Sequence, residues 1–87
     1  MIFMDKILVC KILTFIKNNY LNDPYFGLSS DEVIDSLPEY PRETIIDHIV
    51  MLCREDYIIG SNWADDYPQS IEKLTFKGNN VLKSLSL

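Results

Sequence analysis

The chain has 87 residues, of which 47% are hydrophobic and 24% are charged, and its formal net charge is −5 at pH 7. This length and composition favour one small globular domain with a modest core, and they exclude a disordered chain. Two cysteines that do not form a C-x-x-C pair, Cys10 and Cys53, exclude a disulfide framework.

The charges are distributed unevenly along the chain. Residues 21–72 hold twelve acidic side chains against only Arg42 and Arg54, whereas six lysines lie in residues 1–20 and 73–87 with Asp5 as the one acid. Nucleic-acid affinity depends mainly on contacts from Lys and Arg to phosphates. The middle of the chain is therefore expected to repel DNA.

Residues 5–20 are predicted to form an amphipathic helix, because at 100° per residue their apolar side chains share one arc of about 160°. This arc contains Leu8, Val9, Ile12, Leu13, Phe15, Ile16 and Tyr20. Ile7 and Cys10 fall on the polar side. Either another element covers them, or they form the seam of a homodimer with help from residues 2–4.

The apolar start of the chain, residues 1–16, raises the question of a membrane or export segment. It is too short to span a bilayer, charges interrupt it, and no small-residue cleavage site follows. We therefore expect no membrane role, a cytoplasmic location and reduced cysteines.

Residues 21–28 are predicted to be a loop or a short strand, since Asn, Asp, Pro and Gly are turn residues. A short helix should follow, because Ser29 and Glu32 have the spacing of a capping box. This helix should end before Pro38, since the residue before a proline disfavours helical angles. Its buried side would consist of Val33, Ile34 and Leu37.

Residues 39–56 are predicted to contain a third helix, with Pro41 at its first position. Its apolar arc contains Ile45, Ile46, Ile49, Val50, Leu52 and Cys53. The opposite side, predicted to be exposed, contains Glu43, Thr44, Asp47, His48, Met51, Arg54 and Glu55.

Residues 57–60 and 70–75 are predicted to be two strands that flank a polar turn from Ser61 to Ser70. The turn has no Lys or Arg, and it contains Trp63, Asp65, Asp66 and Tyr67. Thr75 should cap a last helix. The buried side of that helix would consist of Val81, Leu82 and Leu85.

The order of these elements predicts an α+β fold, a winged helix-turn-helix that spans residues 1–87 as one domain. It should have about four helices and a two- or three-stranded antiparallel wing. The third helix occupies the position of a recognition helix.

Three motifs in the last third of the chain carry a resemblance to a known family. They are "DYIIG", an acidic and aromatic turn containing "DDYP", and "LTFKGNNVLK". From Arg54 to Lys83 the chain thereby resembles the YjcQ-like proteins, a small phage- and prophage-associated winged-helix family. The resemblance implies a winged-helix fold and a phage or prophage setting, and it supplies no functional residues.

The sequence offers little for catalysis or metal binding. His48 is the only histidine, and it lies about 140° around its helix from Cys53, so the two cannot pair within that helix. We expect His48 to face solvent. The cysteines and His48 lack the usual spacing of metal ligands, and Asp65–Asp66 lacks the calcium-loop pattern. We therefore expect a protein without catalytic activity, metal or cofactor.

The leading functional hypothesis is a protein-interaction module whose acidic, aromatic turn suits a basic protein surface. The residues predicted to bind this partner are Trp63, Asp65, Asp66 and Tyr67 in the turn, with Asp47 and Met51 on the third helix. Trp and Tyr are common anchors at interfaces. At least one of the two aromatic side chains is nevertheless expected to fold back on the hairpin.

The alternative is a DNA-binding transcriptional regulator. Its predicted contacts are Arg42, Thr44, His48 and Arg54. Three acidic residues on the same surface weaken this alternative. An acidic decoy for a nucleic-acid-binding protein is a third option. The lysines of the first and last helices either face solvent or form a separate basic patch that would bind DNA in an unusual orientation.

Overall fold

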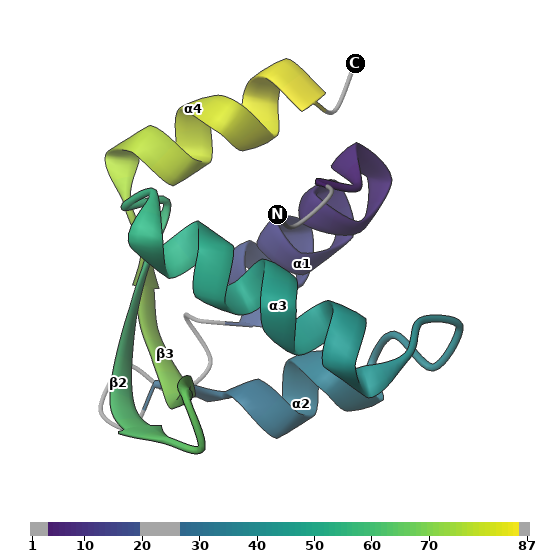
Figure 1. Cartoon of the computed structure of the whole chain (residues 1–87). Helices are drawn as coiled ribbons and strands as arrows, with labels where there is room; N and C mark the ends of the chain where they lie inside the picture. Colours follow the sequence, from purple (N-terminus) through teal and green to yellow (C-terminus); the bar gives the residue numbers. More distant parts are fainter. Residues whose placement is uncertain (1–3, 20–26, 86–87) are drawn as a thin grey trace.

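The structure is a computed structural model that describes residues 4–19 and 27–85 (Figure 1). These residues form helix α1 (Lys6–Asn19), strand β1 (Leu28–Ser29), helices α2 (Ser30–Asp35) and α3 (Arg42–Arg54), strands β2 (Ile58–Ala64) and β3 (Tyr67–Leu74), and helix α4 (Phe76–Leu85). The predicted α+β fold is confirmed. Four helices and a three-stranded antiparallel sheet with a β2–β3 hairpin are consistent with a winged helix.

The sheet has the order β1-β3-β2, so β3 is its central strand. Leu28 of β1 pairs with Ile71 of β3, and Ile58 of β2 pairs with Leu74 at the other end of β3. Helices α1, α2 and α3 all contact β3, and in Figure 1 they lie on one side of the hairpin. The core therefore forms between one face of the sheet and these three helices.

Apolar residues from every element fill this core. The side chains that are completely inaccessible to solvent are Leu8, Ile12, Leu13, Ile16, Val33, Ile45, Ile49, Leu52 and Ile71. Most of the apolar residues whose spacing predicted α1 and α3 are thus residues that these helices bury.

Helix α1 begins one residue later than predicted, and its apolar arc is buried as expected except for Phe15, which is half-buried. Tyr20, residues 1–3 and residues 21–26 lie outside the described residues. The expectation that another element covers Ile7 is wrong, because its side chain is 66% exposed. Cys10 is half-buried.

The predicted starts of the helices are confirmed to within one residue. The side chain of Ser29 caps α2 by accepting a hydrogen bond of 3.2 Å from the backbone N–H of Asp31. Pro41 is the N-cap of α3 and not its first helical residue. The hydroxyl of Thr75 caps α4 by accepting a hydrogen bond of 2.9 Å from the N–H of Gly78.

The predicted ten-residue turn between the strands is wrong. Strands β2 and β3 extend to Ala64 and Tyr67, which pair with each other, and only Asp65 and Asp66 remain between them. Both aspartates have positive φ angles, 55° and 68°. Such a two-residue turn matches the twist of a hairpin, and Asp tolerates the left-handed conformation that it requires.

Candidate protein-binding surface

The end of the hairpin exposes two carboxylates and one large aromatic side chain. Asp65 and Asp66 form the turn and are exposed. Trp63, one residue before the closing pair of the hairpin, is 52% exposed. A tight turn of this kind holds its side chains in a fixed direction, so the two carboxylates and the indole are presented together.

Tyr67, the other aromatic residue of the predicted turn, is turned inward and only 7% exposed. Its hydroxyl accepts a hydrogen bond of 3.0 Å from Nη2 of Arg42. Tyr67 is therefore not available to a partner, contrary to its place among the predicted partner-binding residues. It is the aromatic residue that folds back on the hairpin, whereas Trp63 stays exposed.

Arg42 joins three elements. Its Nη2 donates to Tyr67 on β3 and, at 3.1 Å, to Oδ1 of Asp31 on α2. The hydrogen bond to Asp31 is the first cause that raises the pKa of Arg42 above its usual value, and the nearby Tyr67 is the second. Nη2 is thus bonded within the protein, although the side chain is 53% exposed, and these bonds compete with the predicted role of Arg42 as a DNA contact. Asp31 is not one of the site residues predicted from the sequence.

His48 is buried, with 3% of its surface exposed, so the prediction that it faces solvent and could reach DNA bases is wrong. Its Nε2 accepts a hydrogen bond of 3.0 Å from the backbone N–H of Asp5, and its Nδ1 lies 2.8 Å from the carbonyl oxygen of Thr44. Together these contacts require the neutral tautomer with the proton on Nδ1. The segment before α1 packs over this side of α3, and periodicity within α3 cannot reveal that.

The remaining exposed side of α3 is mainly acidic. Glu43, Asp47 and Glu55 are exposed, together with Arg54. Met51 is half-buried and packs against the core, and Thr44 is half-buried. The bond between Arg42 and Tyr67 places the start of α3 beside the hairpin. We call the exposed side chains of Glu43, Asp47, Trp63, Asp65 and Asp66 the acidic surface.

Cys53 is not poised for nucleophilic chemistry. Cys53 lies between α3 and β2, where burial raises the pKa of its thiol to about 11, and the backbone N–H of Gly60 lowers it by less. A thiol with such a pKa is protonated at neutral pH, and the thiolate is the reactive form. Cys10 has its Sγ 4.0 Å from the hydroxyl of Thr14.

Among residues 4–19 and 27–85, no three His, Cys, Asp or Glu side chains converge in a way that could hold a metal ion. None of the described helices is long and apolar enough to cross a membrane.

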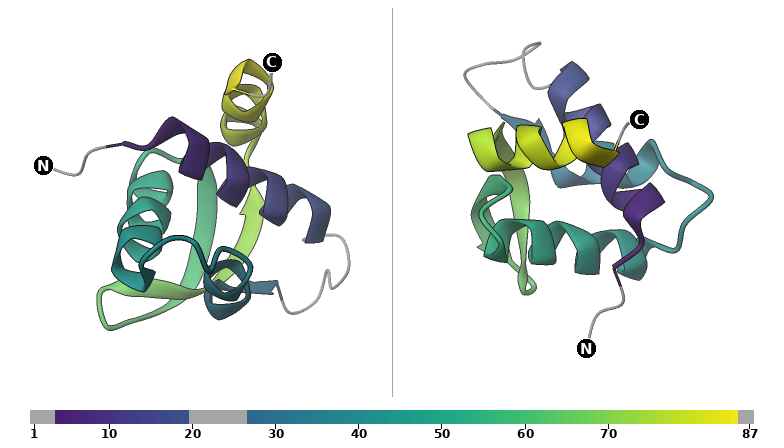
Figure 2. Two further views of the ribbon diagram at one scale, coloured as in Figure 1. Left: turned by 90° about the vertical axis from the view of Figure 1, so that its right-hand side faces the viewer. Right: turned by 90° about the horizontal axis from the view of Figure 1, so that it is seen from above.

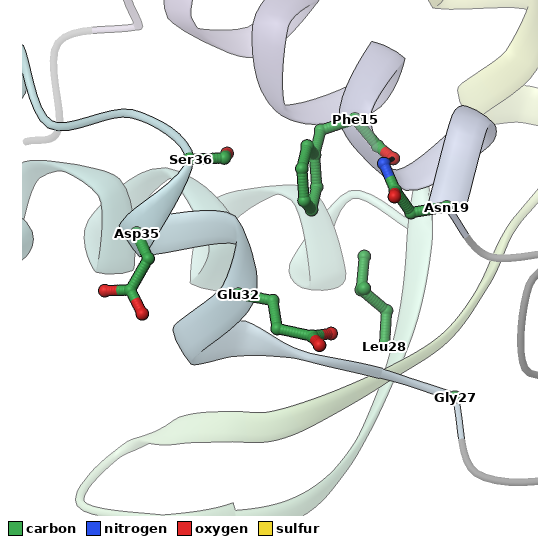
Figure 3. A pocket seen from close by; sticks show the side chains of 7 residues that line it. All are labelled: Phe15, Asn19, Gly27, Leu28, Glu32, Asp35 and Ser36. Atoms are coloured by element: carbon green, nitrogen blue, oxygen red, sulfur yellow. Dashed lines mark hydrogen bonds between the residues drawn. The ribbon is translucent and has the colours of Figure 1, made fainter.

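A pocket opens between α1, β1 and α2 (Figure 3). The ring of Phe15 and the side chain of Leu28 point into it, and Glu32 extends toward Leu28, while Asp35 points away. Gly27, at its rim, adjoins residues 20–26, which lie outside the described part of the chain. The pocket brings together no set of groups with a recognisable chemistry.

Comparisons with protein-family models, with curated proteins and with solved structures found no match to this chain. The resemblance to the YjcQ-like proteins therefore stays a prediction.

Proposed function

We propose that this protein acts by binding, and not by catalysis, and that its acidic surface docks onto a basic patch of another protein. The observation that carries the proposal is the end of the hairpin, where Trp63 is 52% exposed beside two exposed carboxylates. A large aromatic side chain is costly to leave in water, and it is a common anchor at protein interfaces.

The charges near this surface support the same proposal. Arg42, the cation that could neutralise the turn, already bonds Asp31 and Tyr67. Opposite charges on two surfaces speed their encounter and reject wrong partners. The surrounding carboxylates would therefore select a partner rich in Lys and Arg, while Trp63 would supply most of the affinity.

The alternative, DNA reading by α3, loses support from the same contacts. Of its four predicted DNA contacts, His48 is buried and Arg42 is bonded within the protein. Arg54 stays exposed, and Glu43 and Asp47 lie on the same helix surface. Each of these carboxylates would repel the negatively charged phosphate backbone.

The proposal is tested by retention of partner proteins from host-cell extract on the immobilised protein. The sharpest variant combines Asp65→Asn and Asp66→Gly with Trp63→Ser. Asn-Gly is the preferred sequence for this turn, so the hairpin is kept while the charges and the anchor are removed. We expect at least one protein that binds the wild type to be lost, and to be eluted by salt.

A matched control alters an ion pair on another side of the molecule. Lys11 and Glu39 lie 3.4 Å apart, between α1 and the loop after α2. The double variant Lys11→Gln, Glu39→Gln should retain every partner. If the triple hairpin variant also retains every partner, the proposal is wrong.

A further inference from the structure

Helices α1 and α4 pack on each other at the end of the molecule away from the hairpin turn, and we call this pair of helices the α1–α4 layer (Figure 1). They contact each other, and α4 lies across α1 in both views of Figure 2. Lys17 near the end of α1 donates a hydrogen bond of 3.2 Å to Asn79 near the start of α4. At the other end, Ile7 and Leu85 line one hollow.

This layer carries positive charge only. Helices α1 and α4 contain five lysines and no acidic residue. Lys11 is ion-paired with Glu39. None of the other four makes an ion pair with another residue in the described ranges. The hydrogen-bond partners of Lys17 and Lys77 are neutral, a side-chain amide and the backbone carbonyl of Glu55.

Phe76, the first residue of α4, is 83% exposed, which makes it the most exposed large apolar side chain in the described part of the chain. Nothing in the core requires it, since α4 packs through Leu82 with help from Val81 and Leu85. The residues around it on α4 are Lys77, Asn79 and Asn80. An aromatic ring among lysines and amides is the composition of a surface on which bases stack while cations contact phosphates.

We propose that this face, formed by Lys6, Lys17, Phe76, Asn80 and Lys83, binds single-stranded nucleic acid. The lysines contact the phosphates, and the ring of Phe76 stacks on a base. A flat ring at a convex surface cannot reach a base inside a duplex, so a single strand is favoured. The hairpin turn lies at the opposite end of the molecule (Figure 1), so Asp65 and Asp66, which form the turn, lie away from the bound strand. This site is independent of the protein interface proposed above.

The test is fluorescence anisotropy of a labelled single-stranded oligonucleotide of mixed sequence, titrated with the full chain at low salt. We expect binding that weakens as salt is added, because each contact between a lysine and a phosphate releases a counterion. Phe76→Ser should weaken binding about tenfold, as expected for loss of one stacked base. Lys17→Gln with Lys83→Gln should weaken binding and reduce the dependence on salt.

The control is Lys11→Gln, which removes one lysine of α1 that is already ion-paired, and it should bind like the wild type. Circular dichroism must show that each variant is folded. Absence of binding by the wild type at low salt would overturn the proposal, as would equal effects of Lys11→Gln and the Lys17, Lys83 pair. Equal affinity for duplex and single strand, unchanged by Phe76→Ser, would also overturn it.

Analytical ultracentrifugation without nucleic acid tests the alternative explanation, which is that this face binds a second copy of the protein. If the wild type forms salt-sensitive oligomers that the Lys17→Gln, Lys83→Gln variant does not form, and no oligonucleotide binds, the face belongs to a second copy and our assignment is wrong. The hairpin variant described above should bind the oligonucleotide normally, so failure of one proposal leaves the other standing.

Discussion

At the scale of single residues, His48 fixes the start of α1. The side chain of Asp5 caps α1 by accepting hydrogen bonds from the N–H groups of Ile7 and Leu8, both at 3.0 Å. The backbone N–H of the same aspartate donates to His48. One imidazole on α3 thus holds the residue that begins α1, which couples the two helices that contribute most to the core.

We expect His48→Ala to lower the free energy of unfolding by about 2–4 kcal/mol, because it leaves a buried N–H unpaired and opens a cavity. Urea unfolding followed by circular dichroism measures the loss. The neighbouring exposed change Asp47→Ala is the control and should alter stability little. Similar losses in both variants would show that the hydrogen bond from Asp5 contributes nothing.

The raised pKa of Cys53 predicts that the free energy of unfolding depends on pH in the alkaline range. Burial raises its pKa from an ordinary value of 9.0 to about 11 in the folded protein. Between these values the unfolded chain releases the thiol proton while the folded chain keeps it, so the free energy of unfolding falls as pH rises through this window. Below it, the thiol contributes no pH dependence.

Because lysines and tyrosines also titrate in this range, the measurement is a difference between variants. Unfolding midpoints in urea at pH 8 and near pH 10.5 should fall less steeply for Cys53→Ala than for the wild type. Cys10→Ala, which leaves Cys53 in place, should keep the wild-type decline. Parallel declines for the wild type and Cys53→Ala would contradict the assignment.

Features that depend on neighbouring residues could be predicted from the sequence, whereas features that depend on distant residues could not. Helices α1 and α3 and the caps at Ser29 and Thr75 depend on residues within one or two turns, so periodicity and capping rules find them. The burial of His48 depends on a residue 43 positions away. The same holds for Tyr67, whose hydroxyl is bonded by Arg42, 25 positions earlier.

At the scale of elements, the start of α4 rests directly on the turn between α3 and β2. Thr75 donates its hydroxyl to the carbonyl oxygen of Asp56 at 2.6 Å, and its own N–H donates to the carbonyl oxygen of Tyr57 at 3.1 Å. A Cβ on Gly78 would lie 2.0 Å from that oxygen. Only glycine allows this approach of helix to turn, which accounts for the glycine in "LTFKG".

Gly78→Ala should therefore destabilise the protein, although the same change in an open helix would stabilise it by about 1 kcal/mol. The steric clash is expected to cost about 2 kcal/mol or more, because backbone atoms must move apart. Thermal and urea unfolding measure the sign. Asn80→Ala, on the exposed side of the same helix, is the comparison and should be neutral or slightly stabilising. A stabilising Gly78→Ala would contradict the close packing.

The hairpin shows why element boundaries were harder to predict than elements. Trp63 and Tyr67 belong to the strands. The sequence from Ser61 to Ser70 has no Gly to mark the position of a tight turn, and Pro68 wrongly suggests that the turn continues to that residue. The two residues in the left-handed conformation are both aspartates, and an Asp-Asp pair is a weaker sequence signal for a hairpin turn than Asn-Gly. Of the four residues predicted to form the acidic and aromatic turn, Trp63, Asp65 and Asp66 are exposed, whereas Tyr67 is buried.

At the scale of the whole molecule, β3 holds the fold together. It pairs with β1 and β2 and contacts α1, α2 and α3. A fragment that ends at residue 66 retains three helices and β2 but loses the strand that all of them contact. Such a fragment should show no cooperative unfolding transition, because its helices cannot bury their apolar faces.

The measurement is the unfolding curve of this fragment, with and without a synthetic peptide of residues 67–87. Addition of the peptide should restore the helical signal and a cooperative transition. A fragment that unfolds cooperatively alone would show that the core does not depend on β3.

The position of β3 also determines when the protein can fold during its synthesis. Helix α1 is made first, yet the segments that cover it, β3 and α4, are the last described elements to be made. Until about seventy residues have left the ribosome, only α2 and α3 are there to cover the apolar side of α1, and complete folding must wait for contacts between distant parts of the chain. The lysines on the opposite side of α1 would help to keep the partly folded chain soluble until then.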